Sequence, residues 1–209
     1  MNSRERVKRA INFQHPDRAP ISHAILPSTQ IKYGAALEEI LAEVHEDFGW
    51  HLLPDMQRED FPPLYKSGRN RDDFGVLWDV EIEGMCGIPI EWPLEDWDNY
   101  KTFTWPEFGA GPPKTRLYSG HMAGFSDEYY ARGAWITTFE TMQQLRGMEN
   151  LLVDLVYPEA EVYQLRDDLL AFNLAWIDKW LQHEYDGLHF ADDWGSQTSL
   201  LISPERWRE

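Results

Sequence analysis

Cysteine is almost missing from this chain, which has one, Cys86, among 209 residues. A single thiol cannot form an intramolecular disulfide, and this fits a cytoplasmic protein. No apolar run approaches the roughly 20 residues that a membrane-spanning helix needs. The residues at the amino end are charged and lack the apolar core of a signal peptide. We therefore predict a cytoplasmic location and no membrane partner.

Basic residues are also scarce, because 19 Lys and Arg face 36 Asp and Glu, for a formal net charge of −17. Binding to nucleic acid depends on neutralising phosphates, so nucleic acid is a poor partner for this chain. A substrate with many carboxylates would need a local cationic cluster to overcome the field. The sequence has no glycine-rich dinucleotide or phosphate loop and no Cys–His spacing typical of zinc. It therefore predicts no metal site and no cofactor bound by this chain alone.

What the chain does contain is ample material for a packed core. Hydrophobic residues make up 43% of it, with ten Trp, ten Phe and nine Tyr. This excludes a disordered protein and fits one domain. Short apolar segments alternate with longer segments of helical period, a pattern that indicates parallel strands joined by helices. Strands are predicted at 21–26, 50–53, 133–139 and 188–191, and helices at 3–14, 37–48, 140–146, 148–156 and 158–183.

Two further segments refine this pattern. Residues 74–92 alternate in polarity around a Gly-rich turn, which predicts a β-hairpin inserted between the βα units, with a helix after it at 93–103. The segment 158–183 is the clearest helix, because its large apolar residues step by three and four. We expect this stripe to pack against the sheet: Val162, Leu165, Leu169, Phe172, Trp176 and Trp180.

The most informative acids follow the last predicted strand. Asp192 and Asp193 come directly after it, at the end where βα units carry their chemistry. Buried carboxylates are costly unless they are paired or bound to something, so we predict a catalytic role for this pair. An Asp that merely caps a loop is the alternative. The weaker candidates near predicted strand ends, assigned to substrate binding, are His23, Asp55, Trp135 and Gln197.

Glu140 begins the helix after the strand at 133–139. It is a possible acid or base at a strand end. A glutamate in the first turn of a helix is also favoured by the helix dipole alone.

Three blocks of the sequence resemble the uroporphyrinogen decarboxylase superfamily, and more closely its branch near the corrinoid-dependent methyltransferases. The blocks are Arg4-Glu5-Arg6-Val7 with Asn12 and His15-Pro16-Asp17-Arg18-Ala19-Pro20, then Asp72-Asp73-Phe74-Gly75-Val76-Leu77-Trp78, and finally Ala191-Asp192-Asp193-Trp194-Gly195-Ser196-Gln197 with Leu201-Ile202-Ser203-Pro204-Glu205. The resemblance covers the whole chain. It implies a (β/α)₈ barrel, of which this chain would form about the first four βα units.

The resemblance implies a methyltransferase that acts with a corrinoid protein on a small methyl donor. Asp192, Asp193 and Gln197 would line the mouth of the barrel, and one carboxylate would protonate the leaving group. The zinc ligands of the methyltransferases lie in a C-terminal half that has no counterpart here, so zinc is expected only in a longer relative.

Two alternatives stay open. The first is decarboxylation of a tetrapyrrole, with Asp55 holding pyrrole N–H groups, but the stretch Ala24–Gly34 has no arginine for the substrate's carboxylates. The second is an inactive half-barrel that pairs with a missing C-terminal half or with a second copy of itself, since a half-barrel leaves two sheet edges open.

Overall fold

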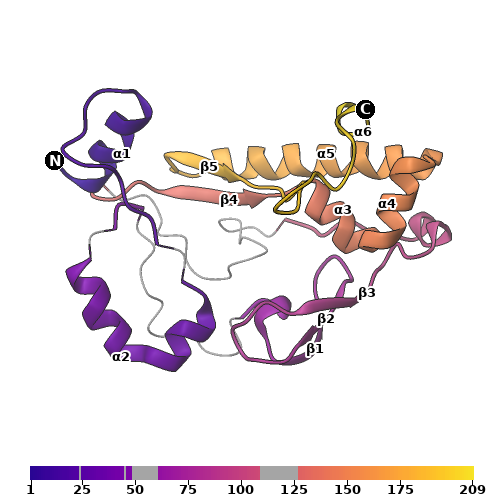
Figure 1. The fold of residues 1–209 in the computed structure, drawn as a ribbon, viewed down its shortest axis with the longest axis horizontal. Coiled ribbons are helices and arrows are strands. Elements are labelled where there is room, and N and C mark those ends of the chain that lie inside the picture. The colour runs from indigo at the N-terminus through magenta and orange to yellow at the C-terminus, as the bar shows by residue number, and fades with distance from the viewer. Residues whose placement is uncertain (24, 45, 49–60, 109–126) are drawn as a thin grey trace.

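The computed structural model describes residues 1–23, 25–44, 46–48, 61–108 and 127–209. These residues form a mixed α/β fold with six α-helices, a three-stranded antiparallel sheet and a two-stranded parallel sheet (Figure 1). They do not form a closed barrel. None of the described helices combines the length and the apolar character needed to cross a membrane.

The parallel sheet pairs β4 (Arg132–Ile136) with β5 (Gly187–Phe190). Three helices connect the two strands, namely α3 (Phe139–Arg146), α4 (Met148–Val156) and α5 (Ala160–Leu181). Both strands lie where the alternation of apolar and helical segments predicted them. The predicted α/β class is therefore confirmed for this part of the chain.

Helix α5 covers one face of this sheet (Figure 1). Trp176 and Trp180 pack with Ala134 and Ile136. Gly133 permits this contact, because a Cβ atom there would lie only 2.4 Å from the ring of Trp180. Five of the six residues in the predicted stripe are buried, and Phe172 is half-buried, so the amphipathic pattern identified the packed face of the helix.

The antiparallel sheet consists of β1 (Gly68–Arg71), β2 (Leu77–Val80) and β3 (Ile88–Glu91). The hairpin predicted at 74–92 is confirmed by β2 and β3, whereas β1 was not foreseen because its sequence is polar. A short 3₁₀ helix, η2 (Pro63–Tyr65), precedes the sheet. The helix predicted at 93–103 is wrong, since this segment forms only the 3₁₀ helix η3 (Trp97–Lys101), capped by Asp96.

Asp72 lies between β1 and β2. Its carboxylate accepts hydrogen bonds from the backbone N–H groups of Phe74 and Val76, both at 3.0 Å, and from the indole Nε1 of Trp78 at 2.9 Å. The aspartate therefore shapes the turn before β2 and holds a core tryptophan in place.

Of the remaining helices, α1 (Ser3–Ile11) lies at the amino end, α2 (Pro27–Glu43) follows an irregular segment, and α6 (Pro204–Arg208) is short. Helix α2 begins ten residues before the predicted helix at 37–48, because Pro27 occupies a position that suits a first helical turn. The helix is interrupted at Gly34, whose φ of 44° lies in the left-handed region.

The strand predicted at 21–26 is wrong for its described residues, which have no regular structure. Instead, the N–H of Ile21 donates to the Asp47 carboxylate, and the carbonyl of Ile21 accepts a hydrogen bond from the backbone N–H of Asp47. The strand predicted at 50–53 lies outside the described residues.

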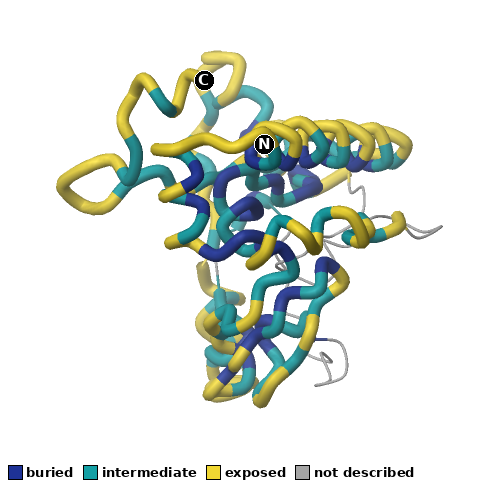
Figure 2. Tube along the Cα trace, turned by 90° about the vertical axis from the view of Figure 1, so that its right-hand side faces the viewer, coloured by how far each residue is buried: buried dark blue, intermediate teal, exposed yellow. Residues whose placement is uncertain are grey.

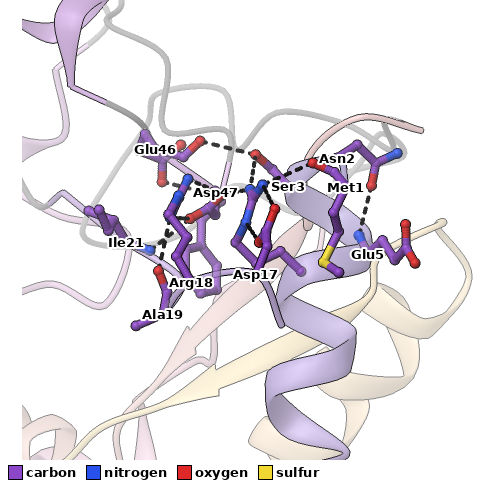
Figure 3. A network of polar contacts seen from close by, with 12 residues as sticks. Met1, Asn2, Ser3, Glu5, Asp17, Arg18, Ala19, Ile21, Glu46 and Asp47 are labelled. Atoms are coloured by element: carbon purple, nitrogen blue, oxygen red, sulfur yellow. Dashed lines mark hydrogen bonds and ion pairs between the residues drawn. The ribbon is translucent and has the colours of Figure 1, made fainter. Parts of the chain in front are cut away.

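Asp47 is the centre of a buried ionic network that connects Arg6, Asp17 and Arg18 (Figure 3). Its side chain is fully buried and accepts from Arg6 Nη1 and Arg18 Nη1, each at 2.6 Å, and from the N–H of Ile21 at 2.8 Å. Asp17 binds the other side of Arg6 at 2.6 Å. Burial alone would raise the pKa of Asp47, but the hydrogen bonds from Arg18, Ile21, Ser3 and Arg6 outweigh it and hold this pKa well below its usual range.

Buried residues gather between the sheets and helices, whereas much of the C-terminal segment is exposed (Figure 2). The main core joins the antiparallel sheet to α3, α4 and α5. It includes Trp78, Leu94, Phe139, Leu145, Leu151 and Leu165.

We predict that Asp47→Asn lowers the free energy of unfolding by roughly 3 kcal/mol at pH 7, because it removes the buried negative charge that binds both Arg6 and Arg18. Urea denaturation followed by circular dichroism measures the change. Asp178→Asn is the control, since Asp178 is exposed on α5. Equal stability of the two variants would contradict this role.

The pH dependence provides a second observable for the same pair. The pKa of Asp47 is lowered on folding, so its stabilisation is present above the unfolded-state pKa of about 3.9 and is lost as the pH falls through the folded-state value. The difference in stability between the wild type and Asp47→Asn is therefore expected to narrow below about pH 4.

Candidate functional site

An aspartate that follows β5 holds the carboxyl end of β4 and the first turn of α3. Asp192, two residues after β5, accepts hydrogen bonds from the backbone N–H groups of Thr138, Phe139 and Glu140, each at 2.9 Å. These N–H groups have no partner within the helix, and a carboxylate suits the positive end of the helix dipole. Asp192 therefore caps the N-terminus of α3 from a position far along the chain, where the N-cap residue Thr138 provides no side-chain hydrogen bond.

Glu140 lies in this first turn and is half-buried. Its pKa is raised, first by burial and then by the negative charges of Asp192 and Asp193. Both influences favour the protonated form of Glu140, which is the form that a general acid needs.

A small cavity of about 20 Å³ opens beside Glu140. This volume suits about one water molecule or a small group of a ligand. Polar side chains of α3 and α5 and several aromatic rings line this cavity. Its lining includes Trp135, Thr137, Glu140, Gln144, Phe172 and Asn173.

The remaining predicted catalytic residue, Asp193, is exposed, and so is Gln197. The charge of Asp193 reaches Glu140, whereas neither Asp193 nor Gln197 lines the small cavity. Between them, Trp194 stacks on Phe139 with ring centroids 4.2 Å apart. The segment 194–201 is thus fixed to α3 by an aromatic contact, and it displays Gln197 towards solvent.

Trp135 lies in the cavity wall, as the prediction of a substrate-binding role requires. It stacks on His189 of β5 with ring centroids 4.2 Å apart. Ala134 precedes it with a φ of 59°, unusual for a residue with a side chain, at a register shift between Gly133 and Ile136. Such a bulge re-aims the side chain beside it. Burial and the charge of Arg132 lower the pKa of His189, which favours its neutral form.

Of the two other predicted substrate-binding residues, the structure describes only His23. His23 does not line the small cavity, and its Nε2 atom is buried without a hydrogen-bond partner. Asp55 lies outside the described residues, so its predicted role is not tested.

No three His, Cys, Asp or Glu side chains gather to hold a metal ion within the described ranges. The described residues therefore do not provide a zinc site. Cys86, the one thiol of the chain, is exposed.

Comparison with known proteins adds no name to this site. No protein-family model matches the chain, and no curated protein or solved structure matches it either.

Sequence reasoning missed Gln144 and Asn173 as lining residues. Asn173 is buried on α5, within the stripe of large apolar residues. A polar residue at a predicted core position is a signal that could have identified it, since buried amides need polar partners. Gln144 gives no such signal, because glutamine is common anywhere on a helix.

The cap predicts a difference between the two neighbouring acids. Asp192→Asn is expected to lower the free energy of unfolding by about 1–2 kcal/mol, because an amide accepts fewer and weaker bonds from the three N–H groups. Asp193→Asn, one residue away and exposed, is the matched control and should lie within about 0.5 kcal/mol of the wild type. Thermal and urea unfolding measure both. Equal effects would contradict the capping role of Asp192.

Proposed function

We propose that this chain forms part of a (β/α)₈ barrel enzyme of the uroporphyrinogen decarboxylase superfamily, acting as a methyltransferase with a corrinoid protein. In this proposal Glu140 donates a proton to the leaving group of a small methyl donor. The observation that carries the proposal is the half-buried Glu140, whose pKa is raised and which lines a cavity at the carboxyl end of a parallel strand. Catalytic groups of such barrels lie at that end of the strands.

The exposed edge of the parallel sheet supports the proposal that this chain is part of a larger barrel. Phe190 is 61% exposed although it belongs to a parallel strand, and among the described residues β5 pairs only with β4. Parallel strands are usually covered on both faces and continued at their edges. A further βα unit beside β5, from this or another polypeptide, would bury Phe190 and extend the sheet.

In this proposal each side chain of the site has a different role. Glu140 holds the proton, and the charges of Asp192 and Asp193 favour its protonated state. Asp192 also fixes the helix turn that carries Glu140, so the acid keeps its position when the donor binds. Thr137 and Gln144 offer hydrogen bonds to the donor, and Trp135 supplies an apolar wall. This assigns to Glu140 the acid role predicted for one of the paired aspartates.

A corrinoid held by a partner protein supplies, when bound, the nucleophile that accepts the methyl group. Protonation by Glu140 makes the remaining fragment a better leaving group, which is the contribution of a general acid. No step through zinc is proposed, because the described residues do not fit a zinc site.

Methyl transfer to free cob(I)alamin tests the proposal. The wild-type chain is incubated with methanol or methylamine, and the loss of cob(I)alamin absorbance gives the rate. Glu140→Gln is expected to lower the rate with the accepted donor about 100-fold or more. Glu149→Gln, an exposed glutamate in the first turn of α4, is the matched control. Absence of transfer from every donor, or full activity of Glu140→Gln, would contradict the proposal.

The pH profile provides an independent check. A general acid works only while protonated, so the rate is expected to fall as the pH rises through the pKa of Glu140. Asp193→Asn removes one of the charges that raise this pKa. The decline should therefore move to lower pH in Asp193→Asn. An unchanged pH profile in Asp193→Asn would contradict either the general-acid role of Glu140 or the effect of the Asp193 charge on its pKa.

A further inference from the structure

A second and larger cavity, of about 180 Å³, lies on the other side of α3. Phe139 and Met142, three residues apart on that helix, face it, whereas Glu140 and Gln144 face the small cavity. Residues three or four apart share a face of a helix, so the first turn of α3 separates the two cavities. The larger cavity therefore lies outside the proposed catalytic site.

The walls of this cavity are mainly apolar and aromatic. Trp194 and Trp207 meet edge to face at 6.1 Å, and Trp194 is backed by Phe139. Trp207 is 56% exposed, which leaves a large apolar surface in contact with water. A cavity of about 150 Å³ with apolar walls binds benzene, so this one, which is open on one side, admits one or two rings.

The charged side chains of the lining are Arg166, Arg206 and Glu209. Arg166 forms an ion pair with Asp167, and Arg206 forms one with Glu209, so the guanidinium groups do not give the lining a net positive charge. A guanidinium group with unused N–H donors can still bind an anionic ligand.

Arg206 is the guanidinium best able to bind such a ligand. It donates from Nη1 to the Glu209 carboxylate at 2.6 Å and from Nη2 to the Val156 carbonyl at 3.4 Å. Within the described part of the chain its remaining N–H donors have no protein acceptor, and guanidinium groups bind carboxylates in a planar, two-point geometry. Arg166 is more occupied, since it donates to Asp167 and to the Glu209 carbonyl.

We infer that this cavity is a binding site for a small aromatic carboxylate, with one or two rings between Trp194 and Trp207 and the carboxylate on Arg206. This function goes beyond the proposed methyl transfer. It depends on the shape of the lining and on the Arg206 guanidinium, and it involves neither Glu140 nor a corrinoid.

Titration calorimetry with 2-naphthoate tests the site, and 2-naphthylmethanol is the uncharged analogue of the same size. The wild type is expected to bind 2-naphthoate at least about fivefold more tightly than the alcohol, because a charge-assisted hydrogen bond is stronger than a neutral one. Arg206→Gln should remove this preference and leave the alcohol unaffected. Arg208→Gln is the matched control, since Arg208 is on the same helix but does not line the cavity.

A filled cavity tests the position of the ring. Ile202→Trp inserts a large side chain at a lining position and is expected to abolish binding of both compounds. Ile82→Trp, at a residue exposed in the hairpin, should bind both as the wild type does. Circular dichroism checks that each variant is folded.

Three outcomes would overturn the inference. They are no binding of either compound by the wild type, unchanged 2-naphthoate affinity in Arg206→Gln, and unchanged binding by a folded Ile202→Trp. Glu140→Gln should bind 2-naphthoate normally, so loss of methyl transfer and loss of this site are distinguishable.

Discussion

The bond between the Asp192 carboxylate and the first N–H groups of α3 is the constraint on which the parallel unit depends. It joins the segment after β5 to the first turn of α3, the helix that follows β4. Helix termini leave N–H groups without partners, and a carboxylate satisfies several of them together. With this cap in place, the direction of α3 is set, and so is the position of Glu140 on its first turn.

A second aspartate performs the corresponding task at the amino end of β5. The Asp186 side chain, 4% exposed, binds Arg4 and Lys8 of α1 and the N–H of Ala131 beside β4. Burial alone would raise its pKa, but the bonds from Arg4 and Lys8 lower it, so it stays charged. One short strand is thus held at both ends by carboxylates, and α1 covers the end opposite the candidate site.

The first turn of α3 separates two chemical environments. The acid Glu140 faces a small cavity lined by polar and aromatic side chains, and Phe139 and Met142 face a mainly apolar one with guanidinium groups at its edge. Proton transfer and binding of an aromatic anion would conflict in one cavity, because a nearby guanidinium lowers the pKa of a carboxyl group. Their separation by one helix turn lets neighbouring residues of the same segment take different roles.

Local pattern in the sequence determined a good part of this protein. The stripe of α5, the hairpin of β2 and β3, and the strands β4 and β5 follow from apolar spacing and turn residues, which act over a few positions. The polar β1 and the irregular residues around Ile21 escaped, because their partners, β2 and Asp47, lie far along the chain. Only the tertiary structure decided that Asp192 caps a helix 52 residues earlier and that Glu140 has the raised pKa. Both depend on burial and on charges brought together through space, which periodicity along the chain does not encode.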